Sequence, residues 1–128
     1  MLGGKNMAHF IYEYSANLPE ELLDLQGLMQ KMHQKAAETN IFPMAGMRSR
    51  AAKCELFRVA DGDSDKGFLN LSMKVGRGRD EPTRMQAGEM FWKIMLEHLE
   101  PLMAEYSVTL SYEMRELEEK VKFNSRNF

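Results

Sequence analysis

Two halves of the chain carry the same order of hydrophobic patterns, and this order most limits the folds that the chain can adopt. In each half, roughly 8–60 and 66–114, a strand-like segment precedes a segment with helical spacing, and another strand-like segment follows. Strands joined through a helix tend to lie parallel, with a right-handed crossover. Two such strand–helix–strand units predict an α+β fold, in which one mixed four-stranded sheet carries two helices on one face.

The first half begins with a strand and a helix. Residues 9–15 are rich in aromatic and β-branched side chains, which favour strands. Asn17, Pro19 and two following acids predict a helix start with Asn17 as its N-cap. A second strand is expected over 47–59, before a turn at 61–63. Apolar residues spaced by three or four predict one buried helix face, made of Leu22, Leu25, Leu28, Met29, Met32 and Ala36.

The second half repeats this order with clearer signals. Apolar and polar residues alternate over 68–75 and again over 108–114, as they do in half-buried strands. The sequence DEPT at 80–83 predicts a helix start, and Pro101 predicts a kink or an early helix end. The apolar face of this helix is expected to comprise Ala87, Phe91, Ile94, Met95, Leu99 and Leu102.

Composition indicates one ordinary soluble domain. Of the 128 residues, 44% are hydrophobic and 28% are charged, and the formal net charge is −2. We therefore expect neither nucleic acid nor an anionic membrane as a partner. No apolar run reaches the length of a membrane span, and the opening MLGGKNM lacks the apolar core of a signal peptide, so we expect a cytoplasmic protein. We divide the chain into an N-terminal extension or tag at 1–7 and a single domain at 8–128.

Two basic segments are candidates for binding an anion. The sequence GRGR at 76–79 lies between a strand end and a helix start, where backbone amides and a helix N-terminus favour negative charge. The sequence RSR at 48–50 enters a strand, so Arg48 and Arg50 share one face and Ser49 lies on the other. An arginine in either segment suits a carboxylate or a phosphate. The alternative is that these arginines are merely solvated.

Metal and thiol chemistry have little support in the sequence. The three histidines, His9, His33 and His98, match no metal-ligand spacing, so no metal site is expected. The single cysteine, Cys54, excludes an internal disulfide and is expected to be a small buried residue. From the residues alone, the sequence indicates a small anion-binding α+β domain.

Four segments together resemble a known family. They read AHFI at 8–11, IFPMAGMRSR at 41–50, ADG at 60–62 and QAGEM at 86–90. These motifs are similar to those of the 5-carboxymethyl-2-hydroxymuconate isomerase family in the tautomerase superfamily, over residues 8 to about 123. The resemblance implies two β-α-β units in one sheet and three subunits packed sheet to sheet, hence a homotrimer.

The resemblance also implies an activity and a site. The family needs no cofactor and isomerises unsaturated 2-hydroxy diacids of aromatic catabolism, with an N-terminal proline as the base. A secondary amine in an apolar pocket has a lowered pKa, stays neutral at pH 7 and moves a proton along the conjugated chain. By motif, Arg48 and Arg79 correspond to the arginines that hold the diacid and stabilise its oxyanion. The substrate is expected to be a small unsaturated carboxylate.

Ala8 stands where the family has its proline. If translation starts at Met7, removal of this methionine leaves a primary amine on Ala8, which can act as a weaker base. If Met1 is the start, the Ala8 nitrogen is an amide and cannot do so. Two hypotheses therefore stand: an isomerase that uses Ala8, Arg48 and Arg79, or a catalytically impaired relative that binds a small carboxylate.

Overall fold

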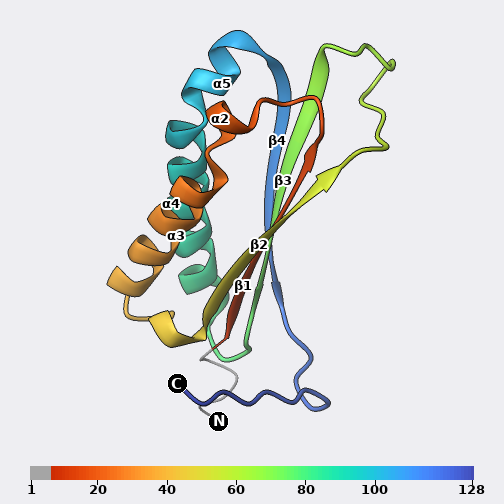
Figure 1. Ribbon diagram of the computed structural model, residues 1–128. Coiled ribbons are helices and arrows are strands. Elements are labelled where there is room, and N and C mark those ends of the chain that lie inside the picture. The colour runs from red at the N-terminus through yellow and green to blue at the C-terminus, as the bar shows by residue number, and fades with distance from the viewer. Residues whose placement is uncertain (1–6) are drawn as a thin grey trace.

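A computed structural model describes residues 7–128 (Figure 1). Its elements run in an order that matches the prediction of strand, helix, strand, strand, helix and strand, with each helical segment divided in two. They are β1 (Ala8–Ser15), α2 (Glu20–Leu23), α3 (Leu25–Glu38), the 3-10 turn η1 (Met44–Gly46), β2 (Met47–Cys54), β3 (Lys66–Val75), α4 (Glu81–His98), α5 (Glu100–Glu105) and β4 (Ser107–Glu116).

The four strands form one mixed sheet in the order β2-β1-β3-β4. β1 pairs with β2 in parallel and with β3 antiparallel, and β3 pairs with β4 in parallel. The helices lie together on one face of this sheet, as Figure 1 shows. The predicted α+β fold, with two strand–helix–strand units and one helical layer, is therefore confirmed.

The core lies between the sheet and the helices. In β3 the predicted alternation is borne out, because Leu69, Leu71, Met73 and Val75 are all buried. The ring of Phe91 on α4 meets Phe10 edge-on, with 5.6 Å between ring centroids, a geometry that aromatic pairs prefer. The other buried residues on the predicted helix faces are Leu28, Met32, Ala36, Ala87, Met95, Leu99 and Leu102.

The first helix differs from its prediction at both its start and its middle. Asn17 is not the N-cap; its side-chain amide instead donates hydrogen bonds to the carbonyls of Ser64 and Lys66, at 3.0 and 2.9 Å. Asp24 has a left-handed backbone with φ of 39°, which ends α2, and its carboxylate caps α3 by accepting from the amide of Gly27. A polar residue that can cap thus divides a continuous apolar pattern.

Two other boundaries were tested by the structure. Pro101 lies in the first turn of α5, and α4 ends at His98, so the predicted early helix end is confirmed. The second strand, β2, ends at Cys54 and not at 59. Cys54 is half-buried and not buried as expected, because it lies at the end of an edge strand.

The second face of the sheet carries no helix within residues 7–128, and we call it the open face. Its side chains alternate with the buried ones along each strand and are mostly polar. Across it, Ser111 donates to Asn70 at 2.6 Å, and Asn70 donates to Ser72 at 3.1 Å. No helix in the described part of the chain is long and apolar enough to cross a membrane.

Tyr12 supports a stability prediction. Its hydroxyl is buried in the core without a hydrogen-bond partner among residues 7–128, and burial raises the pKa of this phenol. We expect Tyr12→Phe to raise the free energy of unfolding by about 1 kcal/mol, because the variant removes an unsatisfied buried polar group. Urea denaturation measures the change. The matched control is Tyr112→Phe, which loses a hydrogen bond of 3.4 Å to the sulfur of Met73 and should gain nothing. A clear loss of stability in Tyr12→Phe would contradict the prediction.

Candidate active site at one end of the sheet

Ala8 lies at the end of the sheet where β1 begins. It is directly opposite Met47 of β2 and Val75 of β3, and only 2% of its surface is exposed. The carbonyl of Met7 accepts a hydrogen bond of 3.2 Å from the amide of Gly76. The nitrogen of Ala8 is therefore placed at the middle of the sheet end, among apolar side chains and beside the loop that follows β3.

Arg79 is held in that loop by backbone carbonyls. Its guanidinium donates to the carbonyl of Ile41 from Nε at 3.0 Å and from Nη2 at 2.6 Å, and Nη1 donates to the carbonyl of Gly76 at 2.9 Å. The guanidinium carbon also lies 4.4 Å from the centroid of the Phe42 ring, within the range of a cation–π contact. Arg79 thus joins the loop after β3 to the segment before η1, and its positive charge is held against Gly76, whose amide bonds the carbonyl of Met7.

The charge of Arg79 persists although its side chain is half-buried. Burial lowers the pKa of the guanidinium, and the nearby Glu116 carboxylate opposes this effect. Because the ordinary pKa of arginine lies far above neutrality, the group stays charged at physiological pH.

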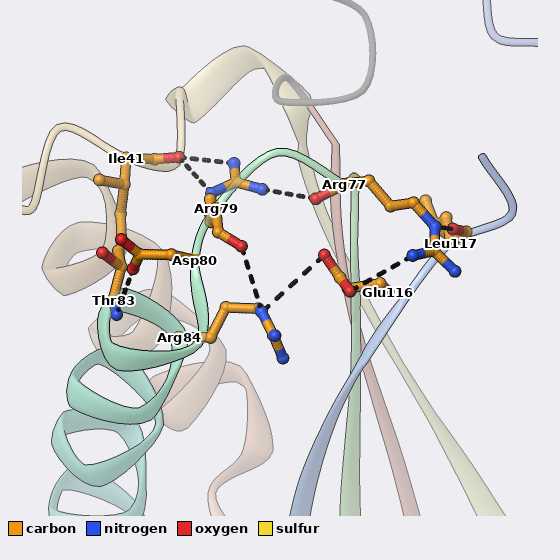
Figure 2. A network of polar contacts seen from close by, with 9 residues as sticks. Ile41, Arg77, Arg79, Asp80, Thr83, Arg84, Glu116 and Leu117 are labelled. Atoms are coloured by element: carbon orange, nitrogen blue, oxygen red, sulfur yellow. Dashed lines mark hydrogen bonds and ion pairs between the residues drawn. The ribbon is translucent and has the colours of Figure 1, made fainter.

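A network of polar contacts fixes the loop that carries Arg79 (Figure 2). The carboxylate of Asp80 accepts from the amide of Thr83 at 2.9 Å and caps α4, as the sequence DEPT predicted. Glu116 at the end of β4 forms ion pairs with Arg77 at 3.6 Å and with Arg84 at 3.8 Å. Because Glu116 comes from the neighbouring strand, it ties the start of α4 and the loop to the sheet.

Glu116 was not identified from the sequence. It belongs to no motif, and it lies two residues beyond the last expected strand, 108–114, whereas the observed β4 ends at Glu116. Parallel strands such as β3 and β4 bring their carboxyl ends to one edge of the sheet. Residues just after β3 and at the end of β4 therefore lie close together. This can be predicted only when the order of the strands is known.

Arg48 lies on the other face of the sheet from Arg79. Its cross-strand neighbour is His9, and its Nη1 lies 3.4 Å from Nε2 of that ring on the open face. Ser49 lies on the face opposite Arg48, as predicted; this is the helix side, where its hydroxyl is 2.7 Å from Nε2 of His33 on α3. Arg79 and the residue before Ala8 thus both bond Gly76, while Arg48 lies at the same end of the sheet on the open face.

The histidines lie in separate environments. The ring of His33 packs on Phe10, with 5.4 Å between centroids, and burial lowers its pKa. His98 lies between Lys31 and the carbonyl of Leu23, at 2.8 and 3.0 Å. Across residues 7–128, no three side chains of histidine, cysteine, aspartate or glutamate are grouped so that they could hold a metal ion.

Comparison with known proteins decides the family. The family model described as 5-carboxymethyl-2-hydroxymuconate isomerase matches residues 8–128. The chain belongs to the 5-carboxymethyl-2-hydroxymuconate isomerase family. It is 40% identical over 121 residues to 5-carboxymethyl-2-hydroxymuconate Delta-isomerase of Escherichia coli, and the match covers 94% of this chain and 95% of the relative. The predicted family is thus confirmed, and with it the expectation of an isomerase.

Solved structures of similar fold support this family assignment. A crystal structure of a 5-carboxymethyl-2-hydroxymuconate isomerase from Deinococcus radiodurans R1 matches with a TM-score of 0.88 and 29% identity, covering 99% of this chain and 95% of that one. A macrophage migration inhibitory factor-like protein of Entamoeba histolytica matches with a TM-score of 0.60 at 11% identity, covering 94% and 96%. At that low identity, the second match concerns the fold alone.

Proposed function

We propose that the chain is a cofactor-independent isomerase that moves a proton along an unsaturated 2-hydroxy or 2-oxo diacid. The substrate is of the type that names the family, 5-carboxymethyl-2-hydroxymuconate, and the reaction belongs to aromatic catabolism. The observation that carries the proposal is the position of Arg79, whose charge lies beside the sheet end where Ala8 begins β1. A base and a cation at one apolar end of the sheet are what proton transfer next to a carboxylate requires.

The base in this proposal is the amine of Ala8, exposed after removal of Met7. An unperturbed α-amino group has a pKa of about 7.7–8.0. The apolar surroundings from Met47 and Val75, together with the positive charge of Arg79, disfavour the protonated amine. Both effects lower the pKa of the amine and leave it neutral at pH 7. It then takes a proton from the enol and returns it to a carbon further along the conjugated chain.

Arg48 and Arg79 bind the diacid and stabilise the oxyanion in this proposal. Because they lie on opposite faces of one sheet, one protomer does not present both to a single small substrate. A second copy whose own open face meets this end of the sheet would supply the missing arginine. This argument supports the homotrimer that the resemblance implies, in which each site combines Arg79 of one protomer with the Arg48 of another.

The alternative is a catalytically impaired protein of the same fold that binds a small carboxylate. The comparisons do not favour it, because the relatives that match over most of the chain are named as isomerases. That residues 1–7 are an extension or tag, that 8–128 form one domain and that the protein is cytoplasmic all stay predictions.

The proposal is tested by making two forms of the protein, one expressed from Met1 and one from Met7. Intact mass spectrometry identifies the first residue of each, and the loss of substrate absorbance with 5-carboxymethyl-2-hydroxymuconate measures turnover. We expect the form that begins at Ala8 to turn over the substrate at least about 100-fold faster than the form that retains residues 1–7, because only the former has a free base. Equal rates in the two forms, or no turnover by a verified Ala8 terminus, would overturn the proposed role of Ala8.

A further inference from the structure

A serine and a histidine outside the candidate active site lie within hydrogen-bond distance of each other. Oγ of Ser49 on β2 is 2.7 Å from Nε2 of His33 on α3, and we call the pair the Ser49–His33 dyad. Both residues are half-buried, and they lie on the helix side of the sheet, away from the open face that the proposed trimer uses. A hydroxyl this close to a neutral imidazole is the arrangement that activates a serine as a nucleophile.

The imidazole of His33 is held in place and is neutral at pH 7. Its ring packs on the ring of Phe10, with 5.4 Å between the centroids and 34° between the planes. Burial lowers the pKa of this imidazole, whose ordinary value is already about 6.5. In the tautomer with its proton on Nδ1, Nε2 accepts the hydroxyl hydrogen of Ser49. His33 can therefore act as a general base for this hydroxyl.

The dyad opens into a hollow between α3 and β2. The hollow has a volume of about 680 Å³, within the range of small-molecule sites. Gln26, Gln30 and His33 line it from α3, and their spacing of four and three residues puts them on one face of the helix. A neighbouring hollow along β2 shares Met29 and Ser49 with it. There is thus room on both sides of Ser49, and the glutamine amides supply hydrogen-bond donors for a carbonyl oxygen.

We propose that the Ser49–His33 dyad is a second reactive site, which cleaves small esters of carboxylic acids through an acyl group on Ser49. In the first step, Oγ of Ser49 forms a bond to the carbonyl carbon, and its proton passes to Nε2 of His33. The bond from this carbon to the alkoxy oxygen then breaks, and His33 gives the proton to the leaving alcohol. In the second step water attacks the acyl group, and His33 takes its proton and passes it to Ser49 as the carboxylic acid leaves.

This activity goes beyond the proposed isomerisation and uses none of its groups. The isomerase needs a free amine on Ala8, whereas the dyad does not depend on where the chain begins. All measurements on the dyad therefore use the form that retains residues 1–7, in which the Ala8 nitrogen is an amide and cannot be acylated in place of Ser49. The two proposals then fail separately.

The ester used as a probe is p-nitrophenyl acetate. Release of p-nitrophenol is followed by absorbance, and the acetyl group is located by mass spectrometry of chymotryptic peptides. Fragmentation of these peptides distinguishes Ser49 from Lys53, the lysine on the same strand. We expect acetyl-Ser49 to form as p-nitrophenol is released and to decline once the ester is consumed, because water then removes the acyl group.

Two variants test the roles within the dyad. His33→Gln keeps a side chain that can hydrogen-bond to Ser49 but removes the base, so acetylation of Ser49 should slow by about 100-fold. Ser49→Ala should abolish the acetyl group at this position and slow the release of p-nitrophenol by a similar factor. The matched controls are His98→Gln, which changes another half-buried histidine of the helix layer, and Ser111→Ala on the open face. Both controls should react like the unchanged protein.

Thermal unfolding establishes that each variant is folded. Undiminished acetylation of Ser49 in folded His33→Gln, or equal losses in the two control variants, would overturn the proposal. A further comparison needs no variant: in the unchanged protein, Ser49 should be acetylated far faster than Ser111, which lies beside Asn70 and has no imidazole partner among residues 7–128. Equal acetylation of the two serines, or none of Ser49, would mean that the contact with His33 is only structural.

Discussion

Ala8→Pro, in the form of the protein that begins at residue 8, is expected to raise kcat by about 100-fold. A positioned general base contributes about 10²–10⁴-fold to proton transfer, and the efficiency depends on how well it is held. The primary amine of alanine rotates about its N–Cα bond, whereas the pyrrolidine ring fixes the nitrogen in one orientation. The assay is the same as for the unchanged protein, with the first residue confirmed by intact mass.

The control for this prediction is the same substitution in the form that retains residues 1–7. There the nitrogen of residue 8 is an amide in both proteins, so Ala8→Pro should add no activity. If the rise were equal in both forms, or absent from the form with a verified proline terminus, the nitrogen of residue 8 would not be the base.

Loss of either proposed substrate arginine is expected to lower kcat/KM by about 10²–10³-fold, the usual effect of removing a donor that stabilises a developing oxyanion. The variants are Arg48→Ala and Arg79→Ala. The matched control is Arg77→Ala, which removes an arginine from the same loop as Arg79, one whose partners are Glu116 and the carbonyl of Leu117. This variant should retain most of the activity.

Mixing the two inactive variants tests whether each site combines two protomers. Exchange of subunits between Arg48→Ala and Arg79→Ala trimers would leave both arginines intact in about one quarter of the sites, by random assortment. We therefore expect activity to return towards about a quarter of that of the unchanged protein, with gel filtration confirming trimers throughout. No recovery despite verified exchange would mean that both arginines of a site come from one protomer.

Local patterns predicted the helices and strands because the buried residues of each element recur along the sequence with the period of that element. The alternation of Leu69, Leu71 and Met73 identifies a strand with one buried face, and all three are buried as expected. The same logic located Ser49 on the face opposite Arg48. It failed at Asp24, where a left-handed residue and a side-chain cap interrupt an otherwise continuous helical pattern. It also failed at Asn17, whose side-chain amide donates a hydrogen bond to the carbonyl of Ser64 in a distant loop instead of capping the helix.

The sequence by itself determined the family, through the motif IFPMAGMRSR at 41–50, and it was enough to place Arg48 and Arg79 among the candidate site residues. Only the tertiary structure decided that Arg79 is anchored on Ile41 and on Gly76, which also bonds Met7, while Arg48 faces the open side of the sheet. The physical reason is that a strand's period assigns its side chains to two faces but does not say which strands are neighbours. The order β2-β1-β3-β4 and its register bring these residues to one end of the sheet.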